Sequence, residues 1–76
     1  NRYRIKHNDH DRALTKDGVV IAQRANGELT ISPGAEDWVS DQDMTYINAF
    51  IKANHGMRRT KEQIIELSDT GKNLLA

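Results

Sequence analysis

The sequence of 76 residues contains no cysteine, which excludes disulfide bonds and thiolate metal sites as sources of stability. This composition fits a reducing compartment, and we expect a cytoplasmic protein. Aromatic residues are also scarce, with one Trp, two Tyr and one Phe. A single domain of this length has a hydrophobic core that is only just large enough to keep the chain folded. Both a monomer and a homodimer that shares apolar surface therefore stay open.

Long apolar runs and an excess of one charge are missing as well. No run approaches the length of a membrane span or a signal-peptide core, so we expect no membrane association. Eleven basic residues balance eleven acidic ones, which argues against non-specific coating of nucleic acid. The charges are nevertheless segregated, because residues 25–43 hold five acids and no Lys or Arg. The first residue is not Met, which indicates processing or a domain from a longer chain.

The clearest local pattern is VVIAQRANGELTIS at residues 19–32, where two β-rich runs flank Asn26-Gly27. Two registers are open for this hairpin. A two-residue turn pairs Ala25 with Glu28 and sets Arg24 opposite Leu29. A three-residue turn pairs Arg24 with Glu28, and we favour it because it keeps a cation out of the apolar face.

Residues 2–7 alternate in polarity and predict a half-buried strand with a cationic outer face. A polar turn at residues 8–11, a short strand at 12–15 and a second turn at 16–18 follow, with Gly18 at positive φ. Together with the hairpin they predict a three- to four-stranded antiparallel meander.

Helices are predicted after Pro33-Gly34, which ends the sheet. Ser40 and Asp43 mark the start of a helix over residues 41–54, and Gly56 is predicted as its left-handed cap. A T-x-x-Q capping box at Thr60 opens a second helix over 61–73, and Gly71 either ends this helix or allows a close approach. Residues 35–39 are predicted as an acidic connector.

The predicted fold is a single α+β domain over residues 1–76, with the sheet at about 2–32 and both C-terminal helices packed on one of its faces. The expected core comprises Ile5, Val19, Ile21, Leu29, Ile31, Ile47, Phe50, Ile51, Ile64 and Leu67.

Two segments are candidates for binding a protein partner. Trp38 lies among the acids Glu36, Asp37 and Asp41, and an exposed Trp is a typical interface hot spot, although it also suits a core position. The basic residues Arg58, Arg59 and Lys61 stand at a helix N-terminus, where cations are unfavourable unless an anion binds there. Pairing with the acids of residues 36–43 or with Glu62 is the local alternative.

The cations Arg2, Arg4 and Lys6 form a stripe on the first strand that could follow a phosphate backbone or could protect a sheet edge. Weak metal candidates stand next to it at His7, Asp9, His10 and Asp11, but their spacing matches no trusted zinc site. We therefore predict neither a metal nor a cofactor.

Catalytic patterns are absent, because none of Ser32, Ser40 and Ser68 lies in a nucleophile elbow and no glycine-rich phosphate loop is present. We expect a small non-enzymatic binding or regulatory protein that acts through protein–protein contacts. The alternative is a nucleic-acid-binding domain that combines the first-strand cations with Arg58, Arg59 and Lys61. That alternative requires both basic elements to lie on one side of the fold.

Overall fold

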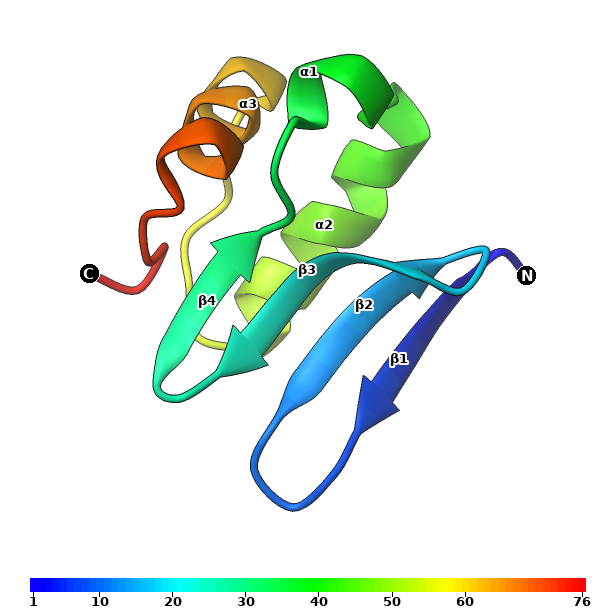
Figure 1. Ribbon diagram of the computed structural model, residues 1–76, viewed down its shortest axis with the longest axis vertical. Helices are drawn as coiled ribbons and strands as arrows, with labels where there is room; N and C mark the ends of the chain where they lie inside the picture. Colours follow the sequence, from blue (N-terminus) through cyan, green and yellow to red (C-terminus); the bar gives the residue numbers. More distant parts are fainter.

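The computed structural model describes all residues, 1–76, and shows a four-stranded sheet followed by three helices (Figure 1). The strands are β1 (Tyr3–His7), β2 (Arg12–Lys16), β3 (Val19–Ala25) and β4 (Glu28–Ile31), and the helices are α1 (Ala35–Trp38), α2 (Asp41–Ala53) and α3 (Lys61–Thr70). The strands lie in the order β1-β2-β3-β4 and every pair is antiparallel. The α+β meander with C-terminal helices is therefore confirmed. None of the helices has the length and apolar composition needed to cross a membrane.

The turn between β3 and β4 has two residues, so the predicted three-residue turn was wrong. Ala25 pairs with Glu28, and Arg24 stands opposite Leu29. Asn26 and Gly27 have φ values of 55° and 78°, the double left-handed geometry that matches the twist of paired strands. The cation is tolerated because Arg24 lies at the end of the sheet and reaches a polar hollow beside His55.

A β-bulge between β2 and β3 decides which residues of β3 enter the core. Leu14 pairs with Ala22 and Thr15 with Val20, so Ile21 is an extra residue in the ladder. The bulge interrupts the alternation of side chains, and both Ile21 and Ala22 are buried. The predicted core position of Val19 was wrong, because this residue lies before the bulge and is 65% exposed.

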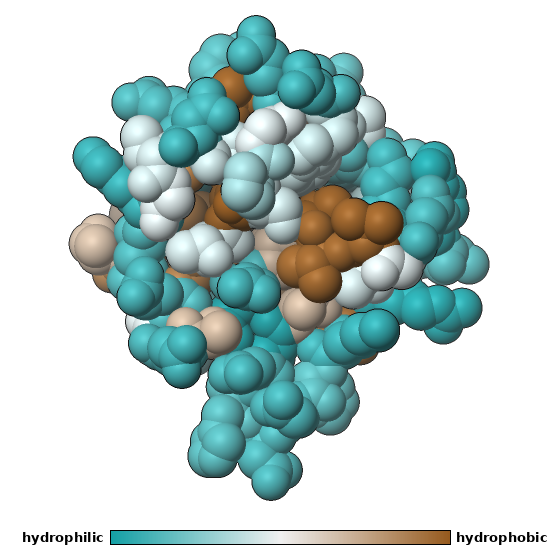
Figure 2. All heavy atoms as spheres, viewed as in Figure 1, coloured by the Kyte–Doolittle hydropathy of each residue, from teal (hydrophilic) through white to brown (hydrophobic).

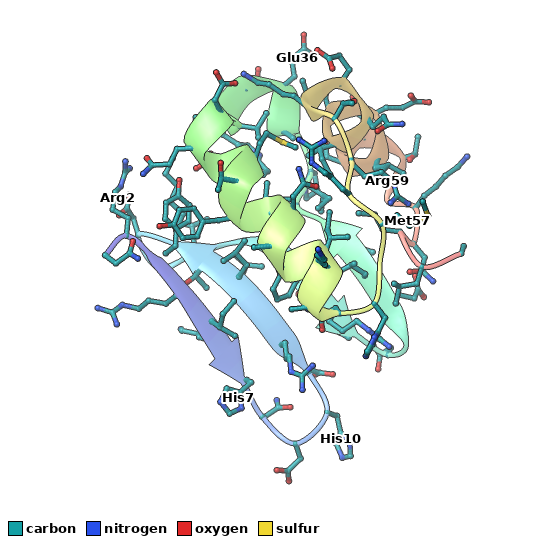
Figure 3. All side chains as sticks on the ribbon, turned by 180° about the vertical axis from the view of Figure 1, so that it is seen from behind. Arg2, His7, His10, Glu36, Met57 and Arg59 are labelled. Atoms are coloured by element: carbon teal, nitrogen blue, oxygen red, sulfur yellow. The ribbon has the colours of Figure 1, made fainter.

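The core fills the space between one face of the sheet and the helices. The predicted members Ile21, Leu29, Ile31, Ile47, Phe50, Ile51 and Ile64 are buried, whereas Leu67 is only partly buried. Ile5 was predicted there wrongly, since it is 50% exposed. Figure 3 shows the reason: α2 crosses the sheet obliquely and moves away from β1 towards His7. Buried residues outside the expected core set include Tyr3, Leu14, Val39 and Leu74.

The helix ends follow the predicted capping boxes with two differences. Ser40 with Asp43 and Thr60 with Gln63 both form reciprocal caps. α3 stops at Thr70, before the predicted residue 73, because Gly71 adopts a left-handed conformation and its N–H caps the carbonyl of Leu67. The connector at 35–39 also contains the single turn α1, which was not predicted.

Gly56 does not serve as the left-handed cap of α2, and that prediction was wrong. His55 occupies the left-handed region, with φ of 69°. Gly56 is needed for space instead, because a Cβ there would lie 2.7 Å from Cγ2 of Ile51 and 3.3 Å from Cδ2 of Leu29. The loop after α2 can therefore cross the core only where a side chain is absent.

The two edges of the sheet differ. On β4, the N–H of Leu29 donates to Oδ1 of Asn73 (2.9 Å) and its carbonyl accepts from the N–H of Leu74 (2.8 Å). The C-terminal segment, residues 72–76, thus covers that edge (Figure 1). No segment covers β1, which leaves one open edge.

We predict that Gly56→Ala lowers the free energy of unfolding by about 1–3 kcal/mol, the usual cost of forcing a methyl group into a packed core. Urea unfolding followed by circular dichroism measures the change. Lys52→Ala, on the exposed face of α2, is the control and is expected to stay within about 0.5 kcal/mol of the parent. Equal midpoints for the Gly56→Ala protein and the parent would contradict the close approach.

Candidate binding groove

A buried carboxylate fixes the N-terminus of α2 against the sheet. Asp43 is fully buried, and one of its oxygens accepts from the N–H of Ser40 (3.1 Å). Its other oxygen accepts from the hydroxyl of Tyr3 and lies 3.0 Å from Nζ of Lys16. The same side chain that caps the helix therefore also binds the start of β1 and the end of β2.

The electrostatics of this cluster favour its ionised form. Burial acts to raise the pKa of Asp43, but the hydrogen bonds from Tyr3, Lys16 and Ser40 outweigh it and lower the pKa. Burial raises the pKa of Tyr3, and its hydrogen bond to Asp43 raises it further. At neutral pH the pair is thus a phenol that donates to a carboxylate.

The aromatic rings of Tyr3 and Tyr46 continue this contact along α2. They stack with centroids 3.8 Å apart and an interplanar angle of 8°. At the other end of the helix, the guanidinium of Arg12 donates to Oδ1 of Asn54 (3.3 Å). Asn54 itself is buried and donates to the carbonyl of Phe50 (2.8 Å). α2 is therefore fastened to β1 and β2 near both ends.

Between these two fastenings lies an open groove, which we call the β1–α2 groove, with a volume of about 520 Å³. Apolar side chains from the sheet and from α2 form most of its lining: Tyr3, Ile5, Leu14, Tyr46, Ala49, Phe50 and Ala53. Its polar lining residues are Arg4, Arg12 and Asn54, and no carboxylate is among them. The groove is thus apolar inside and cationic at its rim.

The backbone of β1 beside this groove has free hydrogen-bonding groups. The carbonyl of Arg2 accepts from the N–H of Asp17, and the N–H of Asn8 donates to the carbonyl of Asp11. Because paired backbone groups alternate along an antiparallel strand, the N–H and carbonyl groups of the even-numbered residues of β1 point towards β2. The N–H and carbonyl of Ile5 then point away from the sheet, as do those of His7.

The acidic part of the predicted partner surface lies apart from this groove. Glu36 and Asp37 are exposed on α1, and Glu36 points away from the fold (Figure 3). Trp38 is half-buried against the core, and its Nε1 donates to the carbonyl of Pro33 (3.1 Å). Figure 2 shows an apolar area over the start of β3, where Val19 and Val20 are exposed and share a shallow hollow with Trp38.

The basic part of that surface has structural contacts of its own. Arg59 exchanges two hydrogen bonds with the side chain of Asn48, and its guanidinium donates to the carbonyls of Met57 and Leu74 (3.0 Å for the latter). Lys61 lies 3.4 Å from a carboxylate oxygen of Asp41, the local pairing named above as the alternative. Arg58 is exposed and forms no ion pair.

One residue from each basic element, Arg2 and Arg59, can be placed relative to α2. Figure 3 shows Arg2 beyond one side of the helix and Arg59 beyond the other. Arg2 is also engaged with Asp17 through a bidentate contact whose shortest distance is 2.7 Å. This side-chain hydrogen bond, together with the attraction between the charges, lowers the pKa of Asp17. Arg2 and Asp17 are therefore already paired with each other.

The residues considered for metal binding stand around the loop between β1 and β2. His7 and His10 project in different directions from it (Figure 3). The chain brings no group of three or more His, Asp or Glu side chains into an arrangement for holding a metal ion.

Sequence reasoning missed the α2 side of the groove. The signal was present as a second apolar row, Tyr46, Ala49, Phe50 and Ala53, at the spacing of one helix face. It lies beside the core row of Met44, Ile47 and Ile51, so the apolar arc of α2 is wider than one contact with a sheet requires.

Comparison of the chain with protein-family models, curated protein sequences and solved structures found no match.

We predict that Asp43→Asn lowers the free energy of unfolding by about 1–3 kcal/mol at pH 7, because Lys16 loses its partner. The folded-state pKa of Asp43 is lowered, so its contribution is present above the unfolded value near 4 and is lost as pH falls through the folded value. Urea unfolding at pH 7 and pH 3 should show that the difference in the free energy of unfolding between parent and variant becomes smaller in acid. A gap of the same size at both values would contradict this role.

Arg59 and Arg58 provide a second stability test. Arg59→Ala should cost about 1–2 kcal/mol, since it removes the hydrogen bonds from the guanidinium to two backbone carbonyls. Arg58→Ala is the matched control and should stay within about 0.5 kcal/mol. Thermal unfolding measures both, and equal melting temperatures for the two variants would show that Arg59 does not hold the loop.

Proposed function

We propose that this protein is a small non-enzymatic binding domain that acts in the cytoplasm through protein–protein contacts and regulates its partner. The observation that carries the proposal is the β1–α2 groove beside an open strand edge. An edge strand with unpaired backbone groups is the element to which extended peptides add in β-augmentation. A neighbouring apolar groove supplies the side-chain contacts on which specificity depends.

The structure around β1 supports a groove that binds a partner rather than a gap left by imperfect packing of the core. Ile5 is half-exposed, although it faces α2 and lies opposite the buried Leu14. The aromatic stack at one end and the Arg12–Asn54 hydrogen bond at the other hold the groove open between them. A partner side chain would therefore enter a preformed site and would not have to pay for its opening.

Trp38 with its neighbouring acids and the exposed Arg58 remain a second proposed contact surface for a protein partner. The hollow that Trp38 shares with Val19 and Val20 supports that proposal. Binding of nucleic acid has less support, because α2 lies between Arg2 and Arg59, and Arg2, Arg59 and Lys61 already have partners. Arg4 and Lys6 are the first-strand cations that stay free of ion pairs.

Selection from a displayed random-peptide library tests the groove. The groove-filling variant is Ala49→Trp, and Thr45→Trp is the control, since both positions are exposed on α2 and Thr45 does not line the groove. We expect peptides that bind the parent and the control but lose at least about tenfold in affinity for Ala49→Trp, the loss of roughly one buried apolar side chain.

Nuclear magnetic resonance of the labelled protein should place the shifted amides at Ile5, Ala49 and Ala53 when a selected peptide binds. Selected peptides that bind all three proteins equally, with shifts around Trp38, would move the function to the second surface. Failure to select any peptide would contradict a peptide-binding domain.

A further inference from the structure

We infer that the open edge of β1 binds an acidic, extended segment of another protein, which adds to the sheet as a fifth strand and places an apolar side chain in the β1–α2 groove. This inference rests on the proposed protein-binding function and names the chemistry of the partner. It is built from three observations: the backbone groups of β1, the side chains that alternate along it, and the charges around the groove.

The backbone of β1 offers hydrogen bonds at a defined place. The carbonyl of Arg4 faces β2, where it accepts from the hydroxyl of Thr15 (3.4 Å), in agreement with the alternation set by Arg2 and Asn8. The N–H of Tyr3 is occupied by Oδ1 of Asn1 (3.2 Å). Ile5 is therefore the first residue of β1 with both backbone groups free, and an incoming strand pairs with it through two hydrogen bonds.

The side chain opposite Ile5 then has only one direction available. Directly paired residues of neighbouring strands project from the same face of a sheet. Ile5 projects towards the groove, so its partner on the added strand does so too and reaches the exposed Ala49 and Ala53. An apolar side chain suits this position, because the inner lining of the groove is apolar.

The residues before and after that apolar side chain meet cations. In an antiparallel addition they stand opposite Arg4 and Lys6, which flank Ile5 along β1. Both are exposed, and neither has a carboxylate within 4.0 Å. Arg12, at the rim of the groove, also lacks a carboxylate partner. An acid on each side of the apolar residue complements this edge.

The same charges disfavour a second copy of this chain as the occupant. A two-fold antiparallel pairing of β1 with itself centred on Ile5 sets Arg4 opposite Lys6 of the other copy. Centring it on Arg4 or on Lys6 sets each of these cations opposite itself. Like charges in directly opposed positions destabilise strand pairing, so the edge favours an acidic strand over its own.

Titration with synthetic peptides tests the inference. The probe is acetyl-Thr-Thr-Glu-Ile-Glu-Thr-Thr-amide, with Gln-Ile-Gln, Lys-Ile-Lys and Glu-Ala-Glu versions as matched peptides. We expect the acidic peptide to bind about three- to tenfold more tightly than the Gln version, with a preference that shrinks as salt rises. The Lys version should bind more weakly still, and the Ala version should lose affinity through the empty groove.

Variants of the protein provide the reciprocal test. Arg4→Glu/Lys6→Glu should reverse the preference, so that the Lys peptide binds more tightly than the Glu peptide. Arg4→Gln/Lys6→Gln should abolish the preference for the Glu peptide, and this variant keeps the test available if the charge reversal disturbs folding. Lys52→Glu, an exposed cation on α2 outside the groove, is the control and should leave the order of affinities unchanged. Slowed hydrogen exchange of the Ile5 amide on binding reports the added strand directly.

The outcomes separate this inference from the proposed function. Library-selected peptides that fill the groove without acids, and that ignore the Arg4 and Lys6 variants, would overturn the acidic partner and leave the binding domain standing. If neither the synthetic peptides of any charge nor the library-selected peptides bind at the groove, both the acidic partner and the proposed binding function would be overturned. An oligonucleotide of thymidines that binds more tightly than the acidic peptide at equal salt, and loses affinity in the Arg4 and Lys6 variants, would assign the edge to nucleic acid.

Discussion

The placement of α2 depends on a single buried carboxylate. Asp43 caps the helix through Ser40, accepts from the hydroxyl of Tyr3 and pairs with Lys16. A buried charge of this kind is tolerated only when several partners satisfy it, and here the partners come from three elements. The cap thus fixes the start of α2 over the ends of β1 and β2. The oblique path of the helix from that point opens the space between α2 and β1.

The two edges of the sheet show two solutions to one problem. Hydrogen bonds of Leu29 with the side chain of Asn73 and the N–H of Leu74 cover the β4 edge, whereas the β1 edge carries exposed cations and stays open. Charged side chains on an edge discourage pairing with identical chains. They do so by electrostatic repulsion, which acts against a strand of the same charge but not against a strand of the opposite charge. An edge protected by Arg4 and Lys6 against its own copies is for the same reason attractive to an acidic strand.

The parts of the fold that local sequence determines were predictable. Both capping boxes and the left-handed geometry of Gly18 follow from a few adjacent residues and appear as expected. The hairpin register was predicted wrongly because a cation opposite Leu29 looked unfavourable, whereas the turn geometry of Asn26-Gly27 decided the pairing. The local turn code was the stronger signal in this case.

The errors lie where distant segments decide the outcome. Val19 is exposed because a bulge at Ile21 shifts the alternation, and no residue of β3 marks that bulge. Gly56 serves the contact with Ile51 and Leu29, which no cap pattern contains. Arg59 looks like a free cation in the sequence but bonds to the carbonyl of Leu74, fifteen residues away. Tertiary contacts of this kind leave no periodic trace.

The groove itself follows from the shortage of core material. The molecule is flat, with extents of 31 × 31 × 18 Å, and a single layer of helix covers one face of the sheet. α2 carries two apolar rows, and burying the first in the core leaves the second facing β1 across a gap. A chain of this length has few large side chains to fill that gap. The Asp43 cluster at one end and the Arg12–Asn54 hydrogen bond at the other connect α2 to β1 and β2. Their separation keeps the apolar surface between them available to a partner.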